Sequence, residues 1–163
     1  MIPSNINASR GFGQGNSGAA TVEFALVSIV FFTVLFGIIE GGRLIYDYNR
    51  VSFAARDGAR WAAVHASASE DREKTIAEIQ AYVSDRSFGL VPATDLDLDD
   101  ASDEGVAVQT IILKDGTVAD WPANNAPDNL VRVTASAIFS PIVGLVPIGQ
   151  LTLRSTATML IHR

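Results

Sequence analysis

The sequence predicts an α+β protein in which one long N-terminal helix packs on a small antiparallel β-sheet. Three observations indicate this fold class. Residues 19–39 form an apolar run with Glu23 as its one ionisable side chain. A proline-free stretch with apolar residues at intervals of three and four follows, and from residue 106 the interval changes to the two that is typical of strands. The predicted parts are a leader at 1–18, a long helix at 19–67 and an α+β domain at 68–163.

The first half of the long helix is predicted to cross a membrane, over about residues 19–42. A helix rises about 1.5 Å per residue, so about 20 apolar residues reach across the hydrocarbon core of a bilayer. The small residues Gly18 and Ala19 stand before the apolar run, whereas a secretory signal peptide has its small-residue cleavage site after its apolar core. A cut at this place would therefore leave the span on the mature protein. The simpler alternative is a signal-anchor helix in which Glu23 has no special role.

The second half of the long helix carries charges beside its apolar stripe. Spacings of one turn permit three ion pairs, namely Glu40–Arg43, Asp47–Arg50 and Asp57–Arg60. Small residues form a broad face, made of Ala54, Ala55, Gly58, Ala59, Ala62, Ala63 and Ala66. We expect this face to pack against the chain's own domain, with a neighbouring subunit as the alternative.

Gly37 and Gly41 are four residues apart near the end of the apolar run. Small residues at this spacing let two helix backbones approach closely within a membrane. The sequence predicts helix packing there. An incidental occurrence is the alternative, since glycine is common in membrane helices.

The domain after the long helix is predicted to contain a second, shorter helix and three strands. We expect the helix at about 70–87, because Gly89 and Pro92 close its apolar pattern. The strands are expected at 106–113, 130–139 and 151–161, where Val, Ile and Thr are frequent. One face of such a sheet needs a cover, and the amphipathic half of the long helix can provide it.

Two connections have unusual compositions. Residues 95–104 are strongly acidic, and carboxylates at alternate positions can bind Ca²⁺ as an EF-hand loop does. Such a loop requires glycine at its sixth position, where this chain has Asp100, so we expect a solvated loop or an edge strand instead. Residues 140–149 are apolar, with two prolines and two glycines. We expect them to contact a neighbouring subunit or the outer face of the membrane, with packing beneath the chain's own domain as the alternative.

Composition excludes several classes of function. The net charge of −6 and the pI near 4.7 argue against nucleic acid as a partner. The chain has no cysteine, which excludes a thiol nucleophile, a disulfide and a thiolate metal site. His65 and His162 stand alone, and no catalytic motif accompanies them. The sequence therefore predicts no enzyme, no catalytic or metal-ligating residue and no cofactor.

Several segments resemble a known family. Gly18, a short uncharged spacer and then Glu23 before an apolar span resemble the class III signal peptide of type IV prepilins. The Glu23-Phe24 pair resembles the processing site of tight-adherence (Tad) pilus proteins. The segments at 40–43 (EGGR) and 54–63 (AARDGARWAA) resemble the TadE-like branch of Tad pseudopilins. A proline often found within the span of that family is absent here.

The resemblance implies a pilin-like fold and a minor pilin or pseudopilin that takes part in the biogenesis or initiation of a Tad adhesion pilus. It implies cleavage between Gly18 and Ala19, an assembly role for Glu23 and Phe24, and a packing role for Glu40 and Arg43. The implied partners are a prepilin peptidase, other pilin and pseudopilin subunits, the Tad inner-membrane assembly platform and the lipid bilayer. The implied location is a single pass through a bacterial inner membrane with the domain outside the cytoplasm, before the subunit enters the pilus or primes its assembly. The alternative is a membrane-anchored extracytoplasmic module that binds a peptide or Ca²⁺.

Overall fold

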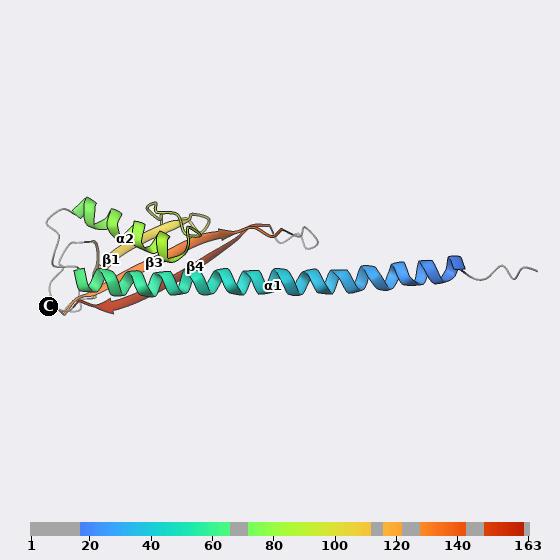
Figure 1. The fold of residues 1–163 in the computed structure, drawn as a ribbon. Helices are drawn as coiled ribbons and strands as arrows, with labels where there is room; N and C mark the ends of the chain where they lie inside the picture. Colours follow the sequence, from blue (N-terminus) through green and yellow to red (C-terminus); the bar gives the residue numbers. More distant parts are fainter. Residues whose placement is uncertain (1–16, 66–71, 112–115, 122–127, 143–148, 162–163) are drawn as a thin grey trace, which may run out of the picture. The chain divides into compact units, whose positions relative to one another are not determined.

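The computed structural model describes residues 17–65, 72–111, 116–121, 128–142 and 149–161. Its elements are α1 (Ser17–His65), α2 (Arg72–Arg86), β1 (Gly105–Ile111), β2 (Val118–Asp120), β3 (Leu130–Phe139) and β4 (Leu151–Leu160). This long helix, short helix and antiparallel sheet confirm the predicted α+β class (Figure 1). The chain forms two compact units, one up to Gly37 and one from Ile38 onward.

The first unit is the N-terminal part of α1. Its apolar side chains, including Phe24 and Val30, are exposed. Helix α1 is long and apolar enough to cross a membrane, by length and composition. The predicted helix at 19–67 is confirmed to within two residues, with α1 ending at His65, and α2 agrees similarly with the predicted helix at 70–87.

The sheet of the second unit has the strand order β2-β1-β3-β4, and every neighbouring pair is antiparallel. Strands β3 and β4 pair along their full length, from Leu130 opposite Leu160 to Phe139 opposite Leu151. The sequence predicted these two strands and β1. It missed β2, which has only three residues, too few for an alternating pattern to be recognised.

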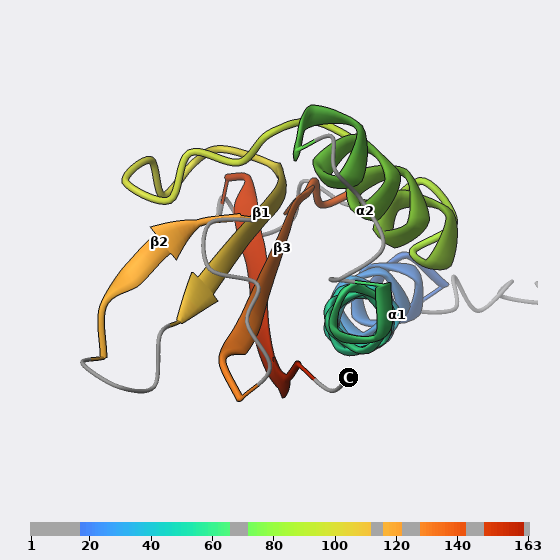
Figure 2. The same ribbon diagram turned by 90° about the vertical axis from the view of Figure 1, so that its left-hand side faces the viewer.

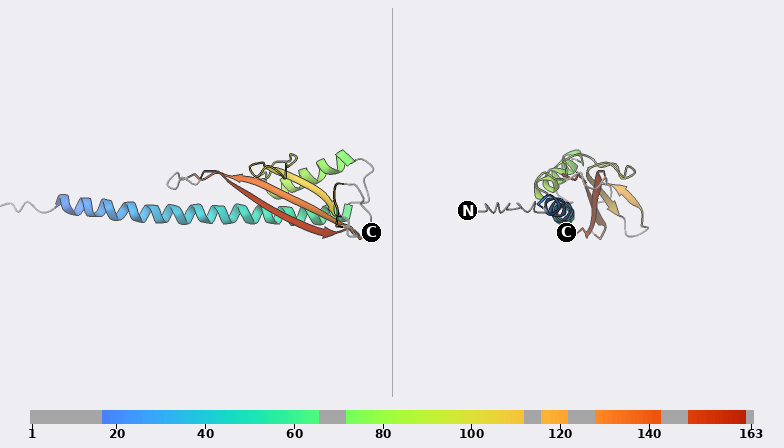
Figure 3. Two further views of the ribbon diagram at one scale, coloured as in Figure 1. Left: turned by 180° about the vertical axis from the view of Figure 1, so that it is seen from behind. Right: turned by 90° about the vertical axis from the view of Figure 1, so that its right-hand side faces the viewer.

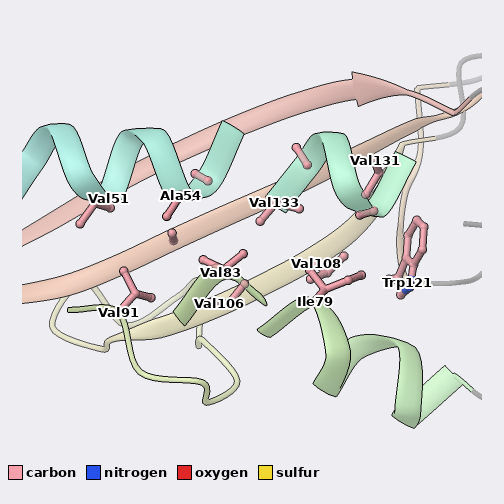
Figure 4. Close-up of a cluster of buried hydrophobic side chains, with 14 of the residues drawn as sticks. Val51, Ala54, Ile79, Val83, Val91, Val106, Val108, Trp121, Val131 and Val133 are labelled. Carbon is pink, nitrogen blue, oxygen red and sulfur yellow. The ribbon is translucent and has the colours of Figure 1, made fainter. Parts of the chain in front are cut away.

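Both helices lie on the same side of the sheet, with the C-terminal half of α1 beside β3 and β4 (Figures 2 and 3). The core fills the space between them and draws on every layer (Figure 4). Its fully buried larger side chains include Val51 from α1, Ile79 and Val83 from α2, Val106 from β1, Val131 and Val133 from β3, and Trp121 after β2. Burial of these side chains supplies the main favourable free energy of folding.

The small-residue face of α1 packs against the chain's own domain, as predicted. Its alanines from Ala54 to Ala63 are buried, while Ala66 lies outside the described residues. At Gly58, an added Cβ would lie 2.4 Å from Cγ2 of Val83 in α2 and 3.6 Å from Cγ1 of Val133 in β3. Small residues are therefore required here because α2 and the sheet approach the α1 backbone closely.

The second face of the sheet is only partly exposed, which the alternating pattern did not predict. Thr134 and Ser136 are buried although they lie on the face away from the helices. The Ser136 hydroxyl donates to the backbone oxygen of Asp103 at 2.8 Å, so the acidic segment before β1 contacts this face. Met159, on the edge strand β4, is 38% exposed.

Candidate functional site

The four residues expected to act in processing and assembly lie in the first two turns of α1. Gly18, Ala19, Glu23 and Phe24 are all exposed. Ala19 and Glu23 are four residues apart in the helix, so they lie on the same face one turn from each other. The bond between Gly18 and Ala19 is thus in the terminal turn, where helices fray most readily.

Beyond Glu23 the apolar run presents few polar atoms that a bilayer would leave unpaired. Its backbone is helical throughout, so its amides and carbonyls are bonded within the segment. The Thr33 hydroxyl donates to the carbonyl oxygen of Ile29 at 2.8 Å. The ring of Phe32 contacts the rings of Phe31 and Phe36. This surface is chemically suited to lipid or to another apolar helix.

The first charged pair after the run ties α1 to the end of β3. Nη1 of Arg43 lies 2.8 Å from Oε1 of Glu40, which confirms this predicted ion pair. The same oxygen accepts a hydrogen bond from the backbone amide of Ile142 at 3.2 Å. The Arg43 guanidinium also lies over the Phe139 ring, 5.3 Å from its centroid. Glu40 therefore connects α1 to the segment after β3 through a hydrogen bond. The sequence did not reveal this role.

Only one oxygen of the Glu40 carboxylate forms these contacts. The side chain is 13% exposed, and Oε2 is buried with no hydrogen-bond partner among the residues that the structure describes. Burying a charged oxygen is costly unless it is paired, so the contacts through Oε1 must hold this side chain in place. Substituting either Glu40 or Arg43 would leave the other charge without its partner.

The glycines near Glu40 are not needed for packing within the domain. An added Cβ at Gly37, Gly41 or Gly42 meets no atom of the described residues within 4 Å. This open surface leaves room for another helix to approach, as the spacing of Gly37 and Gly41 predicts. It is equally compatible with glycines of no special role, so helix packing there stays a prediction.

The second predicted pair, Asp47–Arg50, is present, and its arginine also contacts the end of α2. Nη1 of Arg50 lies 3.3 Å from Oδ1 of Asp47. Nη2 of Arg50 also donates to the backbone oxygens of Ser87 and Phe88, just beyond the end of α2. A cation is favourable beside these C-terminal carbonyls. Arg50 therefore fastens α2 to α1.

The third pair was predicted with the wrong partner. Oδ2 of Asp57 lies 3.1 Å from Nε of Arg86 in α2, and it accepts a hydrogen bond of 3.0 Å from the Tyr82 hydroxyl. The predicted partner, Arg60, is exposed. Beside this contact Trp61 stacks on Tyr82, with ring centroids 5.3 Å apart. The contact joins the two helices, and local spacing in α1 could not indicate it because half of it comes from α2.

The acidic segment before β1 forms hydrogen bonds with itself. Carboxylate oxygens of Asp97, Asp100 and Asp103 accept backbone amides of the same segment. Arg154 of β4 donates to the backbone oxygens of Leu98 and Asp100 and so holds the segment on the sheet. Among the residues that the structure describes, no group of three or more acidic or histidine side chains is arranged to hold a metal ion.

Replacing Ser102 by alanine should raise the pKa of Asp100 toward its ordinary value. The hydroxyl and then the backbone amide of Ser102 donate to Oδ1 of Asp100 and lower its pKa, and Arg154 adds to the effect. Because the folded state has the lower pKa, this interaction stabilises the fold above the unfolded pKa of about 4 and is lost as the pH falls through the folded pKa. An NMR titration of the Asp100 carboxyl measures the change. Thr158→Ala, an exposed change on β4, is the control, and an unaltered Asp100 titration in Ser102→Ala would contradict the assignment.

Together these features define a class of protein. An exposed apolar helix continues into an α+β domain, and Glu40 and Arg43 fasten the domain where the apolar run ends. This arrangement is compatible with a membrane-anchored component, because α1 is long and apolar enough to cross a bilayer.

Comparison with protein families identifies the class more closely. The family model described as TadE-like protein matches residues 18–60. Over that segment the chain is similar to TadE-like proteins, which is consistent with a protein of the Tad system. No curated protein and no solved structure matches the chain.

The match confirms the resemblance seen in the sequence and has a physical counterpart. Its range runs from the predicted cleavage site through the apolar run and the Glu40–Arg43 pair to Gly58 and Arg60. Within this range, Glu40 bonds to the segment after β3, and Gly58 lies in close contact with α2. The matched segment therefore includes the part of α1 that packs against α2 and the sheet, whereas the sheet itself lies outside the match.

Proposed function

We propose that this protein is a minor pilin or pseudopilin of a Tad pilus. It is cleaved after Gly18 by a prepilin peptidase and held in the bacterial inner membrane by the N-terminal part of α1. Its domain lies outside the cytoplasm, and the mature subunit takes part in the initiation or assembly of the pilus. In this role the protein is a substrate and a structural subunit, with no catalytic activity of its own.

One observation carries the proposal: a TadE-like segment begins at Gly18 and coincides with an exposed apolar helix. The single carboxylate in that run, Glu23, lies one turn after Ala19, the residue that cleavage would make the new N-terminus. The partners that follow are the peptidase, the other pilin and pseudopilin subunits, the inner-membrane assembly platform and the lipid bilayer. The space beside Gly37 and Gly41 is compatible with a second helix as neighbour.

Processing after Gly18 is the first testable consequence. Protein made in a host with the matching peptidase should lack its first 18 residues and begin at Ala19, as measured by intact mass. Gly18→Val should abolish the cut, because a branched side chain would stand where the peptidase accepts glycine. The product should then be a full-length membrane protein.

The matched control is Gly42→Val, which changes another exposed glycine of α1, and no atom in the described part of the chain lies within 4 Å of its added Cβ. It should be processed as the wild type is. Full-length wild-type protein in that host, or a cut beyond the apolar run, would overturn the proposed processing.

A further inference from the structure

The segment after β3 is held where the apolar run of α1 ends. The Ile142 amide donates to Oε1 of Glu40, and Glu40 is the first ionisable residue after Glu23. The Ile142 side chain is 74% exposed, so this large apolar group is covered by little protein. Exposure of an isoleucine beside the end of a candidate membrane span calls for an explanation.

Two more exposed apolar side chains lie on α1 just beyond the same level. Ile45 and Tyr46 are 63% and 62% exposed. At about 1.5 Å per residue they follow Glu40 by roughly 8 Å along the helix. Helical side chains lean toward the N-terminus, which brings them nearer the level of Glu40. By the turn of about 100° per residue, Ile45 stands on the side of the helix away from Glu40 and Ile142.

We propose that Ile45, Tyr46 and Ile142, here called the exit collar, lie in the interfacial layer of the bilayer and contact lipid. The inference rests on the membrane span of the proposed function. If residues 24–39 occupy the hydrocarbon core, the boundary of the bilayer falls near Glu40, and the hydrogen bond to Glu40 holds Ile142 at that boundary. The interfacial layer is about 5–7 Å thick on each side, enough to receive the collar.

The charges and the sequence around the collar support lipid as the occupant. Arg43 neutralises Glu40, which lowers the cost of placing this pair beside a bilayer. Tyrosine is enriched at membrane interfaces because its ring is apolar and its hydroxyl can stay hydrated. In the sequence, residues 141–148 continue from the collar without an ionisable side chain. The collar would thus hold the domain against the membrane surface until the subunit leaves the bilayer.

Single cysteines can test the depth of the collar because the chain has none of its own. The full chain carrying Ile142→Cys is labelled with an environment-sensitive fluorophore and placed in phosphatidylcholine–phosphatidylglycerol vesicles. Two matched variants give the limits: Val30→Cys in the apolar run, and Val118→Cys on β2. Val118 pairs with Ile111 of β1, and Ile111 pairs with Leu130 at the start of β3. Ile142 follows the other end of β3, so residue 118 lies at the opposite end of the sheet. All three native side chains are exposed, so the labels should not disturb the core.

The label at residue 142 should have blue-shifted emission and be quenched more by lipids with a shallow nitroxide than by lipids with a deep one. The label at residue 30 should show the reverse depth preference, and the label at residue 118 should show solvent-like emission without quenching. Solvent-like emission at residue 142 together with quenching at residue 30 would overturn the collar and leave the span intact. Absence of quenching at residue 30 would overturn both. Disulfide cross-linking between copies of Ile142→Cys without lipid quenching would overturn lipid in favour of a second copy.

Discussion

Replacing Glu23 by glutamine should leave the protein cleaved and inserted in the membrane but reduce its incorporation into pili about tenfold or more. Glu23 is the one ionisable side chain in residues 19–39, and it is exposed on α1. An unpaired carboxylate in a bilayer costs about 3 kcal/mol or more. Pairing with an amine removes much of this cost, and the α-amino group that cleavage frees at Ala19 is largely protonated at neutral pH.

The position of the α-amino group at Ala19 determines which amine can pair with the Glu23 carboxylate. Ala19 lies one turn from Glu23 in the same helix, so each subunit carries both members of the pair. In an assembly the amine of one subunit can meet the carboxylate of its neighbour only in the correct axial register. A charge-assisted hydrogen bond contributes about 1.5–3 kcal/mol, and about 1.4 kcal/mol corresponds to a factor of ten in an equilibrium constant.

Immunoblots of sheared pili and of membranes measure this effect, with Gly18→Val as the companion variant. Glu23→Gln should give a mature-sized band in the membrane and little in pili, whereas Gly18→Val should give a precursor-sized band. Glu23→Asp keeps the charge but shortens the side chain, and it should retain part of the assembly. If Glu23→Gln protein entered pili like the wild type, the charge would have no role in assembly.

Replacing Gly58 by alanine should destabilise the domain by about 1–3 kcal/mol, as overpacking of a well-filled core does. The new Cβ would lie 2.4 Å from Cγ2 of Val83, and valine in a helix has essentially one side-chain rotamer, so it cannot easily turn away. Relief requires α2 to move from α1, which would disturb the contacts of Arg50 and Asp57 with α2. Urea unfolding followed by tryptophan fluorescence measures the loss, because Trp121 is buried in the folded domain.

Two further variants separate overpacking from a general effect of alanine. Gly42→Ala changes an exposed glycine of the same helix with free space around it, and it should be neutral or stabilising by up to about 1 kcal/mol. Val83→Ala combined with Gly58→Ala should recover part of the loss, because the clashing methyl groups are removed. A midpoint for Gly58→Ala equal to that of the wild type would refute the close contact.

Local patterns predicted most of the fold correctly. The two helices and strands β1, β3 and β4 were located within a few residues, since apolar periodicity records which face of each element is buried. The pairs Glu40–Arg43 and Asp47–Arg50 agree with the spacing, because residues three apart in a helix are neighbours. Asp57 and Arg60 have the same spacing, but Asp57 pairs with Arg86 of α2 instead. Strand β2 was not predicted, because its three residues form a strand only by pairing with the edge of β1.

The sequence alone determined the α+β class, the apolar helix, the small-residue face of α1 and the TadE-like resemblance, which all depend on residues close together in the chain. Only the tertiary structure decided what those residues touch. It placed Val83 against Gly58, Arg86 against Asp57, and the amide of Ile142 against Glu40, 102 residues away. Such contacts depend on how helices and sheet pack in three dimensions, and no spacing along one element records them.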